Sequence, residues 1–139
     1  MNNETILVVD DSQEIITFLT KRALEPLGFR VMTALNGQAG LDLAIEHDPD
    51  LIMLDMSMPQ MTGIEMLQSL RQTLCQSPVI FMTMYGSEQV AVEAFRLGVR
   101  DYISKPFTVE DVQAAVDSAL QEQRLAREKE LLLHDLISS

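Results

Sequence analysis

The sequence predicts a doubly wound α/β protein, in which helices cover both faces of an open parallel sheet. Short apolar runs recur along the 139 residues, and three of them are almost continuously apolar, as expected of strands buried on both faces. The stretches between these runs repeat apolar residues at helical spacing. Five strand–helix units in succession, joined by right-handed crossovers, place helices on both faces of the sheet.

The predicted elements are short and well bounded. The strands are expected at 5–10, 29–34, 51–55, 79–84 and 101–104. The helices between them are marked by residues that cap or stop helices, namely Ser12 and Gly28, Asn36 and Pro49, Gly63, Ser87 and Gly98, and Thr108 with Asp111. This flavodoxin-like (βα)5 arrangement has the strand order 2-1-3-4-5. Its ligands bind beyond the carboxyl ends of the strands where the order reverses, between the first and third strands.

Composition narrows the function classes. The net charge of −11 argues against a surface that binds nucleic acid directly, since phosphates demand Lys and Arg. Cys75 is the single cysteine, so no internal disulfide is possible. No apolar run approaches the roughly 20 residues needed to cross a bilayer, and the start "MNNETILVVDD" lacks the features of a signal peptide. We therefore expect a soluble cytoplasmic protein with no membrane association.

Polar residues follow the apolar runs at the edge where a ligand is expected. The first strand ends in Asp10 and Asp11, the third in Asp55, the fourth carries Thr83 near its end, and the fifth is followed by Lys105. Two adjacent aspartates alone are typical of a turn or a helix N-terminus. The fold, however, brings all five residues to one rim of the sheet.

Three carboxylates at one rim require a counter-charge. Two carboxylates ~5 Å apart repel by about 3 kcal/mol at an effective dielectric constant near 20, so three pairs approach the stability of a whole domain. Lys105 supplies one positive charge. A divalent cation would supply two more, and an all-oxygen site suits Mg²⁺, with Mn²⁺ as a possible substitute.

These stretches resemble the receiver domain of two-component response regulators. The resemblance rests on "ILVVDDS", "PDLIMLDMSMPQMTGIE", "VIFMTM" and "DYISKPF", taken in this order and spacing over roughly residues 4 to 122. It implies that Asp55 accepts a phosphoryl group from the phosphohistidine of a histidine kinase or a phosphotransfer protein. The catalysis would come from positioning and charge neutralisation by Thr83 and Lys105.

The resemblance also implies a ligand set and a switch. Asp11 and Asp55 would bind Mg²⁺ directly, Asp10 through water, and Ser57 through its backbone carbonyl. The Lys105–Pro106 bond would be cis. Tyr102 would turn inward when Thr83 moves toward the phosphoryl group, and the remodelled surface would form a phosphorylation-dependent homodimer. Without the resemblance, Tyr102 is an ordinary half-buried strand tyrosine.

Some features depart from the family pattern or leave alternatives open. Met84 stands where the family has a small residue, so we expect it to crowd access to Asp55; a degenerate receiver acting as a constitutive interaction module is the corresponding alternative. Tyr85 and Ser57 stand where the family tunes hydrolysis. A magnesium-dependent phosphatase with an aspartate nucleophile would share the metal and the acceptor, but needs a second Asp where Ser57 stands.

The C-terminal segment is predicted to be helical. It has no Gly or Pro, and it continues the fifth helix beyond the expected end of the domain. Leu125 and Leu132 lie one heptad apart, which is too short a repeat to establish a coiled coil. We expect residues 1–122 to form the receiver domain and residues 123–139 to be a helical linker toward an output domain.

Overall fold

The computed structural model describes residues 3–84 and 88–138 of the chain. Tyr85 and Ser87 therefore lie outside the described residues. The sheet has five parallel strands in the order β2-β1-β3-β4-β5, which confirms the prediction. Its strands are β1 (Thr5–Val9), β2 (Arg30–Ala34), β3 (Leu51–Asp55), β4 (Val79–Met84) and β5 (Asp101–Lys105).

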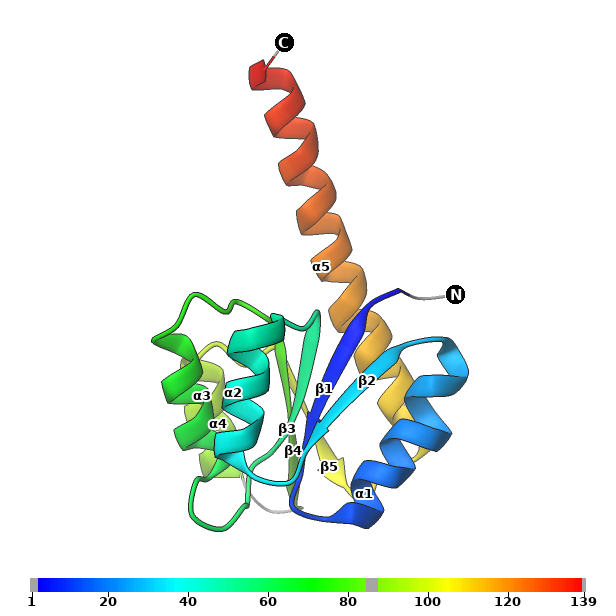
Figure 1. The fold of residues 1–139 in the computed structure, drawn as a ribbon, viewed down its shortest axis with the longest axis vertical. Helices are drawn as coiled ribbons and strands as arrows, with labels where there is room; N and C mark the ends of the chain where they lie inside the picture. Colours follow the sequence, from blue (N-terminus) through cyan, green and yellow to red (C-terminus); the bar gives the residue numbers. More distant parts are fainter. Residues whose placement is uncertain (1–2, 85–87, 139) are drawn as a thin grey trace.

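Alternating side chains of the strands build two hydrophobic cores, one on each face of the sheet. Leu7 and Val9 of β1 point to one face, where they pack with residues of α2 (Gly37–His47), α3 (Gly63–Arg71) and α4 (Glu88–Arg96). Ile6 and Val8 point to the other face, toward α1 (Gln13–Thr17), the segment after it, and α5 (Val109–Ser138). Figure 1 shows the sheet between these two groups of helices. The continuous apolar runs are thus explained by burial on both sides.

The caps predicted from the sequence form. The side chain of Ser12 accepts from the amide of Ile15, and that of Asn36 accepts from the amide of Ala39. Thr108 and Asp111 exchange two hydrogen bonds, each 3.0 Å long, as a reciprocal cap. These bonds satisfy amides that have no partner within a helix, which fixes where each helix begins.

The first helix differs from the prediction of one continuous α-helix between Ser12 and Gly28. After α1 the chain forms a π-helix, η1 (Phe18–Leu24), and then a 3-10 turn, η2 (Glu25–Leu27). Pro26 has no N–H to donate, so the segment ends in the tighter turn. Gly28 then stops it in a left-handed conformation with φ 91°.

Helix α5 continues far beyond the sheet. Its buried residues end at Leu120, yet the helix runs on to Ser138. Figure 1 shows this extension leaving the body at the end of the sheet that lies near the N-terminus of the chain. The expected extended C-terminal helix is therefore present, and we use the name tail for its residues 121–138.

Candidate metal and phosphoryl-acceptor site

Three aspartates meet at the carboxyl ends of β1 and β3. Carboxylate oxygens of Asp10, Asp11 and Asp55 all lie within 4.8 Å of one another. The two strands are direct neighbours, with Val9 in register with Leu54, so the residues that follow must emerge side by side. Asp10 is fully buried and Asp55 nearly so, whereas Asp11 is exposed. The predicted cluster therefore forms, with one member facing solvent.

The ammonium of Lys105 bridges the two buried carboxylates. Its Nζ lies 2.8 Å from Oδ2 of Asp10 and 3.3 Å from Oδ1 of Asp55. The peptide bond between Lys105 and Pro106 is cis, as the resemblance implied. The lysine side chain is only 16% exposed, so little water competes for these ion pairs.

Backbone amides hold the carboxylates from the other side. The amide of Ser12 donates to Oδ1 of Asp10 at 2.9 Å, and the amide of Ser57 donates to Oδ1 of Asp55 at 3.3 Å. Both oxygens of Asp10 are thus engaged. Among the residues that the structure describes, the hydrogen bond and the ion pair of Asp55 both fall on Oδ1, and Oδ2 makes neither.

The electrostatics of the cluster raise the pKa of Asp55 to about 6. Burial is the largest cause and the neighbouring Asp10 carboxylate the second, while Lys105 acts in the opposite direction. For Lys105, burial lowers the pKa, but its hydrogen bond to Asp10 and the attraction of both carboxylates outweigh this, and the pKa is raised. The ammonium therefore stays charged at neutral pH, and one positive charge faces three carboxylates.

The donor set fits a hard divalent cation. Three carboxylates and one ammonium leave a net charge of −2 when all are ionised (−3 + 1). A doubly charged ion balances this charge, and oxygen ligands with an exposed side suit a cation that keeps several waters. Each of the three aspartates can offer one carboxylate oxygen to such an ion.

The predicted switch residues lie on the two strands beside the cluster. Thr83 is buried near the end of β4, in register with Ser104 of β5. Tyr102 is 41% exposed and packs edge-on against Phe95 of α4, with ring centroids 5.7 Å apart. Tyr102 thus faces outward in this structure, and its inward movement stays a prediction. Met84 is 61% exposed and in register with Lys105, and its effect on access likewise stays a prediction.

The sequence marks Gly63 only as the boundary of the third helix, but its role is larger. A Cβ at this position would lie 2.4 Å from the backbone oxygen of Asp55 and 2.8 Å from Cα of Met56. The amide of Gly63 also donates to the carbonyl of Met56 at 3.0 Å. Thr62 and Glu65 then cap α3 reciprocally. Gly63 therefore lets α3 begin directly against the backbone of Asp55 and Met56. The order "TGIE" is the one feature of the sequence that indicates this close approach.

The fold and the site together define a doubly wound α/β protein with an acidic rim at its topological switch point. The family model described as response regulator receiver domain matches residues 6–117. The chain belongs to this family, the receiver domains of two-component response regulators, which are phosphoacceptors.

Similar proteins agree with this assignment. The chain is 40% identical over 124 residues to the regulatory protein AtoC of Escherichia coli (strain K12), covering 88% of this chain and 26% of AtoC. It is 39% identical to PhoP of Bacillus subtilis (strain 168), an alkaline phosphatase synthesis transcriptional regulatory protein, covering 89% of this chain and 51% of PhoP. The chain thus spans about half or less of these relatives' lengths.

Solved structures show the same fold. NtrX from Brucella abortus superposes with a TM-score of 0.87 at 28% identity, over 94% of this chain and 30% of NtrX. A response regulator receiver domain protein from Clostridium thermocellum gives a TM-score of 0.79 at 30% identity, over 88% of this chain and 98% of that one. Among the described helices of the present chain, none combines the length and apolar character that spanning a membrane requires.

The raised pKa of Asp55 predicts a stability change in the metal-free protein. The folded state holds this proton up to a pH of about 6, against 3.8 for the free carboxyl, so stability falls as the pH rises through this window. Asp55→Asn should therefore increase the free energy of unfolding by about 1–3 kcal/mol at pH 7.5, with the gain shrinking toward pH 4.

This prediction is measured by urea unfolding in the presence of a chelator. Asp42→Asn, which alters an exposed aspartate of α2, serves as the control and should change stability little at either pH. An Asp55→Asn gain that does not depend on pH would contradict the assigned ionisation.

Proposed function

We propose that this chain accepts a phosphoryl group from a phosphohistidine onto Asp55, with Mg²⁺ bound at the acidic rim, and that it thereby controls an output domain or partner. The observation that carries the proposal is the cluster of Asp10, Asp11 and Asp55 bridged by Lys105. A buried carboxylate with one oxygen free of recorded partners among the described residues supports a role as nucleophile, and the ammonium of Lys105 beside it would stabilise the negative charge that develops on the transferring group.

In the proposed step, Oδ2 of Asp55 attacks phosphorus in line with the bond to the imidazole nitrogen of the donor. A bond from oxygen to phosphorus forms as the bond from phosphorus to nitrogen breaks, and the electron pair of that bond leaves on the imidazole. The carboxylate must be ionised to attack, which is its main form above pH 6. Lys105 would pair with one phosphoryl oxygen, and the hydroxyl of Thr83 would donate to another.

The metal would be held by the side chains of Asp11 and Asp55 and the backbone carbonyl of Ser57, with Asp10 acting through water. When bound, Mg²⁺ or Mn²⁺ neutralises carboxylate charge and the charge that develops on the transferring group. Oδ2 of Asp10 lies 2.8 Å from the ammonium of Lys105, so Asp10 would also position this ammonium beside Asp55.

We propose that the chain acts as a phosphoacceptor that promotes its own phosphorylation and dephosphorylation, and not as an enzyme acting on a separate substrate. Residues 1–122 would be the receiver and 123–139 a helical linker. The aspartate-nucleophile phosphatase is the weaker alternative because Ser57 cannot act as the general acid that such an enzyme requires. The complete set of Asp10, Asp11, Asp55 and Lys105 at one rim also disfavours a degenerate receiver.

Asp55 is predicted to be the single site of phosphorylation. Incubation with acetyl phosphate and Mg²⁺ should add the mass of one phosphoryl group to the intact chain, and Asp55→Asn should lose that gain completely. Ser57→Ala, two residues away, should retain it. Mass spectrometry of the intact protein measures the result, and a gain that persists in Asp55→Asn would exclude this acceptor.

Mg²⁺ is predicted to stabilise the folded chain by relieving repulsion among the three carboxylates. A ligand that binds only the folded state adds about 1.4 kcal/mol at ten times its Kd. The melting temperature should therefore rise with Mg²⁺ in the parent and in Asp42→Ala, but not in Asp11→Ala. A rise of equal size in Asp11→Ala would remove Asp11 from the ligand set.

Phosphorylation is predicted to strengthen pairing of two chains through the surface of α4, β5 and α5. Phe95 and Tyr102 are exposed on this surface, and Leu125, Leu132 and Leu136 are exposed on the tail. Inward movement of Tyr102 would separate it from Phe95 and alter this surface. Pairing of two chains would cover the exposed leucines of the tail. We expect at least ~10-fold tighter association with beryllofluoride, equivalent to about 1.4 kcal/mol.

Analytical ultracentrifugation of the chain with its tail intact measures this association, and Asp55→Asn provides the control because it should not respond to beryllofluoride. The same dissociation constant with and without beryllofluoride would show that the receiver signals by a route other than dimerisation.

A further inference from the structure

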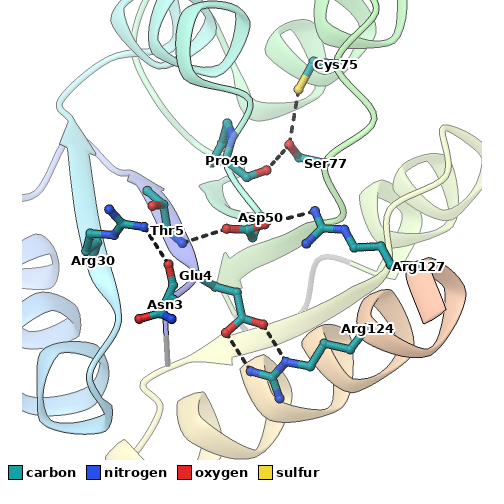
Figure 2. Close-up of polar contacts among 10 residues, drawn as sticks. All are labelled: Asn3, Glu4, Thr5, Arg30, Pro49, Asp50, Cys75, Ser77, Arg124 and Arg127. Carbon is teal, nitrogen blue, oxygen red and sulfur yellow. Dashed lines mark hydrogen bonds and ion pairs between the residues drawn. The ribbon is translucent and has the colours of Figure 1, made fainter. Parts of the chain in front are cut away.

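The tail leaves the body through three ion pairs, each with a residue that immediately precedes a strand. Arg124 pairs with Glu4, which precedes β1, through contacts of 2.5 and 2.8 Å. Arg127 pairs with Asp50, which precedes β3, at 3.0 Å. Glu122 pairs with Arg100, which precedes β5. We call these three pairs the collar; Figure 2 shows the first two.

The residues of α5 that form the collar lie on opposite sides of the helix. Residues two apart on a helix are separated by about 200° around its axis, so Glu122 and Arg124 point in nearly opposite directions. Arg124 and Arg127 are three apart and share one side. A tilt of the tail in either direction would therefore stretch at least one of the three pairs.

Asp50 and Glu4, the two collar residues that pair with arginines of the tail, are themselves held by hydrogen bonds within the body. Oδ2 of Asp50 accepts a hydrogen bond from the amide of Thr5 at 2.8 Å, while Oδ1 accepts from Arg127 (Figure 2). The backbone carbonyl of Glu4 accepts from the amide of Arg30 at 3.1 Å, so β2 holds the chain there. The hydrogen bond from Arg124 is the largest cause that lowers the pKa of Glu4, which keeps this acid charged.

The same strands connect the collar to the acidic rim. β1 follows Glu4 and leads to Asp10, and β3 follows Asp50 and ends at Asp55. A five-residue strand spans about 17 Å, so each strand is a short, hydrogen-bonded rod between the two ends of the sheet. The tail is thus attached to the two strands whose far ends carry the carboxylates.

We propose that the collar fixes the tail as a rigid continuation of the receiver, aligned by β1, β3 and the start of β5, and not as a flexible linker. No described residue of α5 beyond Leu120 is buried against the body, so the ion pairs at the base of the tail are the contacts that can set its direction. Single exposed ion pairs contribute little, whereas three pairs to one helix act together. As a route from the acidic rim to an output, the collar rests on the proposed function.

The direction of the tail can be measured with two spin labels in a Cys75→Ala background. Labels at Gln68→Cys on α3 and at His134→Cys on the tail occupy exposed positions. Pulsed electron–electron double resonance should give one narrow distribution of distances between the two labels in this doubly labelled parent. Its width should at least double in Arg124→Gln/Arg127→Gln, and it should also increase in 1 M NaCl, where the Debye length is about 3 Å.

Two further variants make the result decisive. Lys21→Gln/Arg22→Gln removes the same charge from exposed residues of the π-helix and should leave the distribution narrow. Glu4→Arg/Arg124→Glu reverses one pair and should also keep it narrow, which tests the collar even if the double glutamine variant folds poorly. Equal widths in the parent and in Arg124→Gln/Arg127→Gln, or equal broadening in the matched control, would overturn the collar.

Phosphorylation has no part in this experiment, so the two proposals fail separately. A broad parent distribution would overturn the collar and leave Asp55 as the proposed acceptor. A phosphoryl mass gain that persists in Asp55→Asn would overturn that acceptor and leave the measured width of the tail distribution unchanged.

Discussion

The contact of Lys105 with Asp10 and Asp55 is the interaction on which the acidic rim depends. Without that ammonium, two buried carboxylates within 4.8 Å would repel by about 3 kcal/mol at an effective dielectric constant near 20. Lys105 offsets only part of the unfavourable effects at Asp55, because burial first and the Asp10 carboxylate second raise the pKa of Asp55 to about 6. With all four groups ionised, the site keeps a net charge of −2, and a divalent cation would balance this charge.

The sequence was sufficient to predict the sheet and the rim because both follow from short-range rules. Buried parallel strands read as continuous apolar runs, and the carboxyl ends of such strands meet at one edge. The strand order and the meeting of Asp10, Asp11 and Asp55 were predicted on this basis and are confirmed. Their proposed chemical roles came from a family resemblance, since charges alone do not distinguish a phosphoryl acceptor from a metal ligand.

Features that depend on packing between distant segments could not be predicted in the same way. The π-helical turn of η1 has no residue pattern that marks it, and nothing in the sequence shows that the backbone of Gly63 lies against that of Asp55. Glu4 and its partner Arg124, and Asp50 and its partner Arg127, are ordinary charged residues in the sequence. Their pairing across more than 70 positions exists only because the sheet brings the starts of β1 and β3 beside the exit of α5.

The two ends of the sheet thus differ in how their charged residues are arranged, although the same strands connect them. At the carboxyl ends, three carboxylates are crowded around one ammonium, and the proposed metal binding and phosphoryl transfer rest on this arrangement. At the amino ends, opposite charges are paired and hold a helix in one direction. β1 and β3 join these two ends, because Glu4 precedes β1 and Asp10 follows it, while Asp50 precedes β3 and Asp55 ends it, and the two strands pair in parallel. Coupling between distant sites requires an element with two arrangements that both sites bias, and β1 and β3 are the segments that connect the acidic rim with the collar.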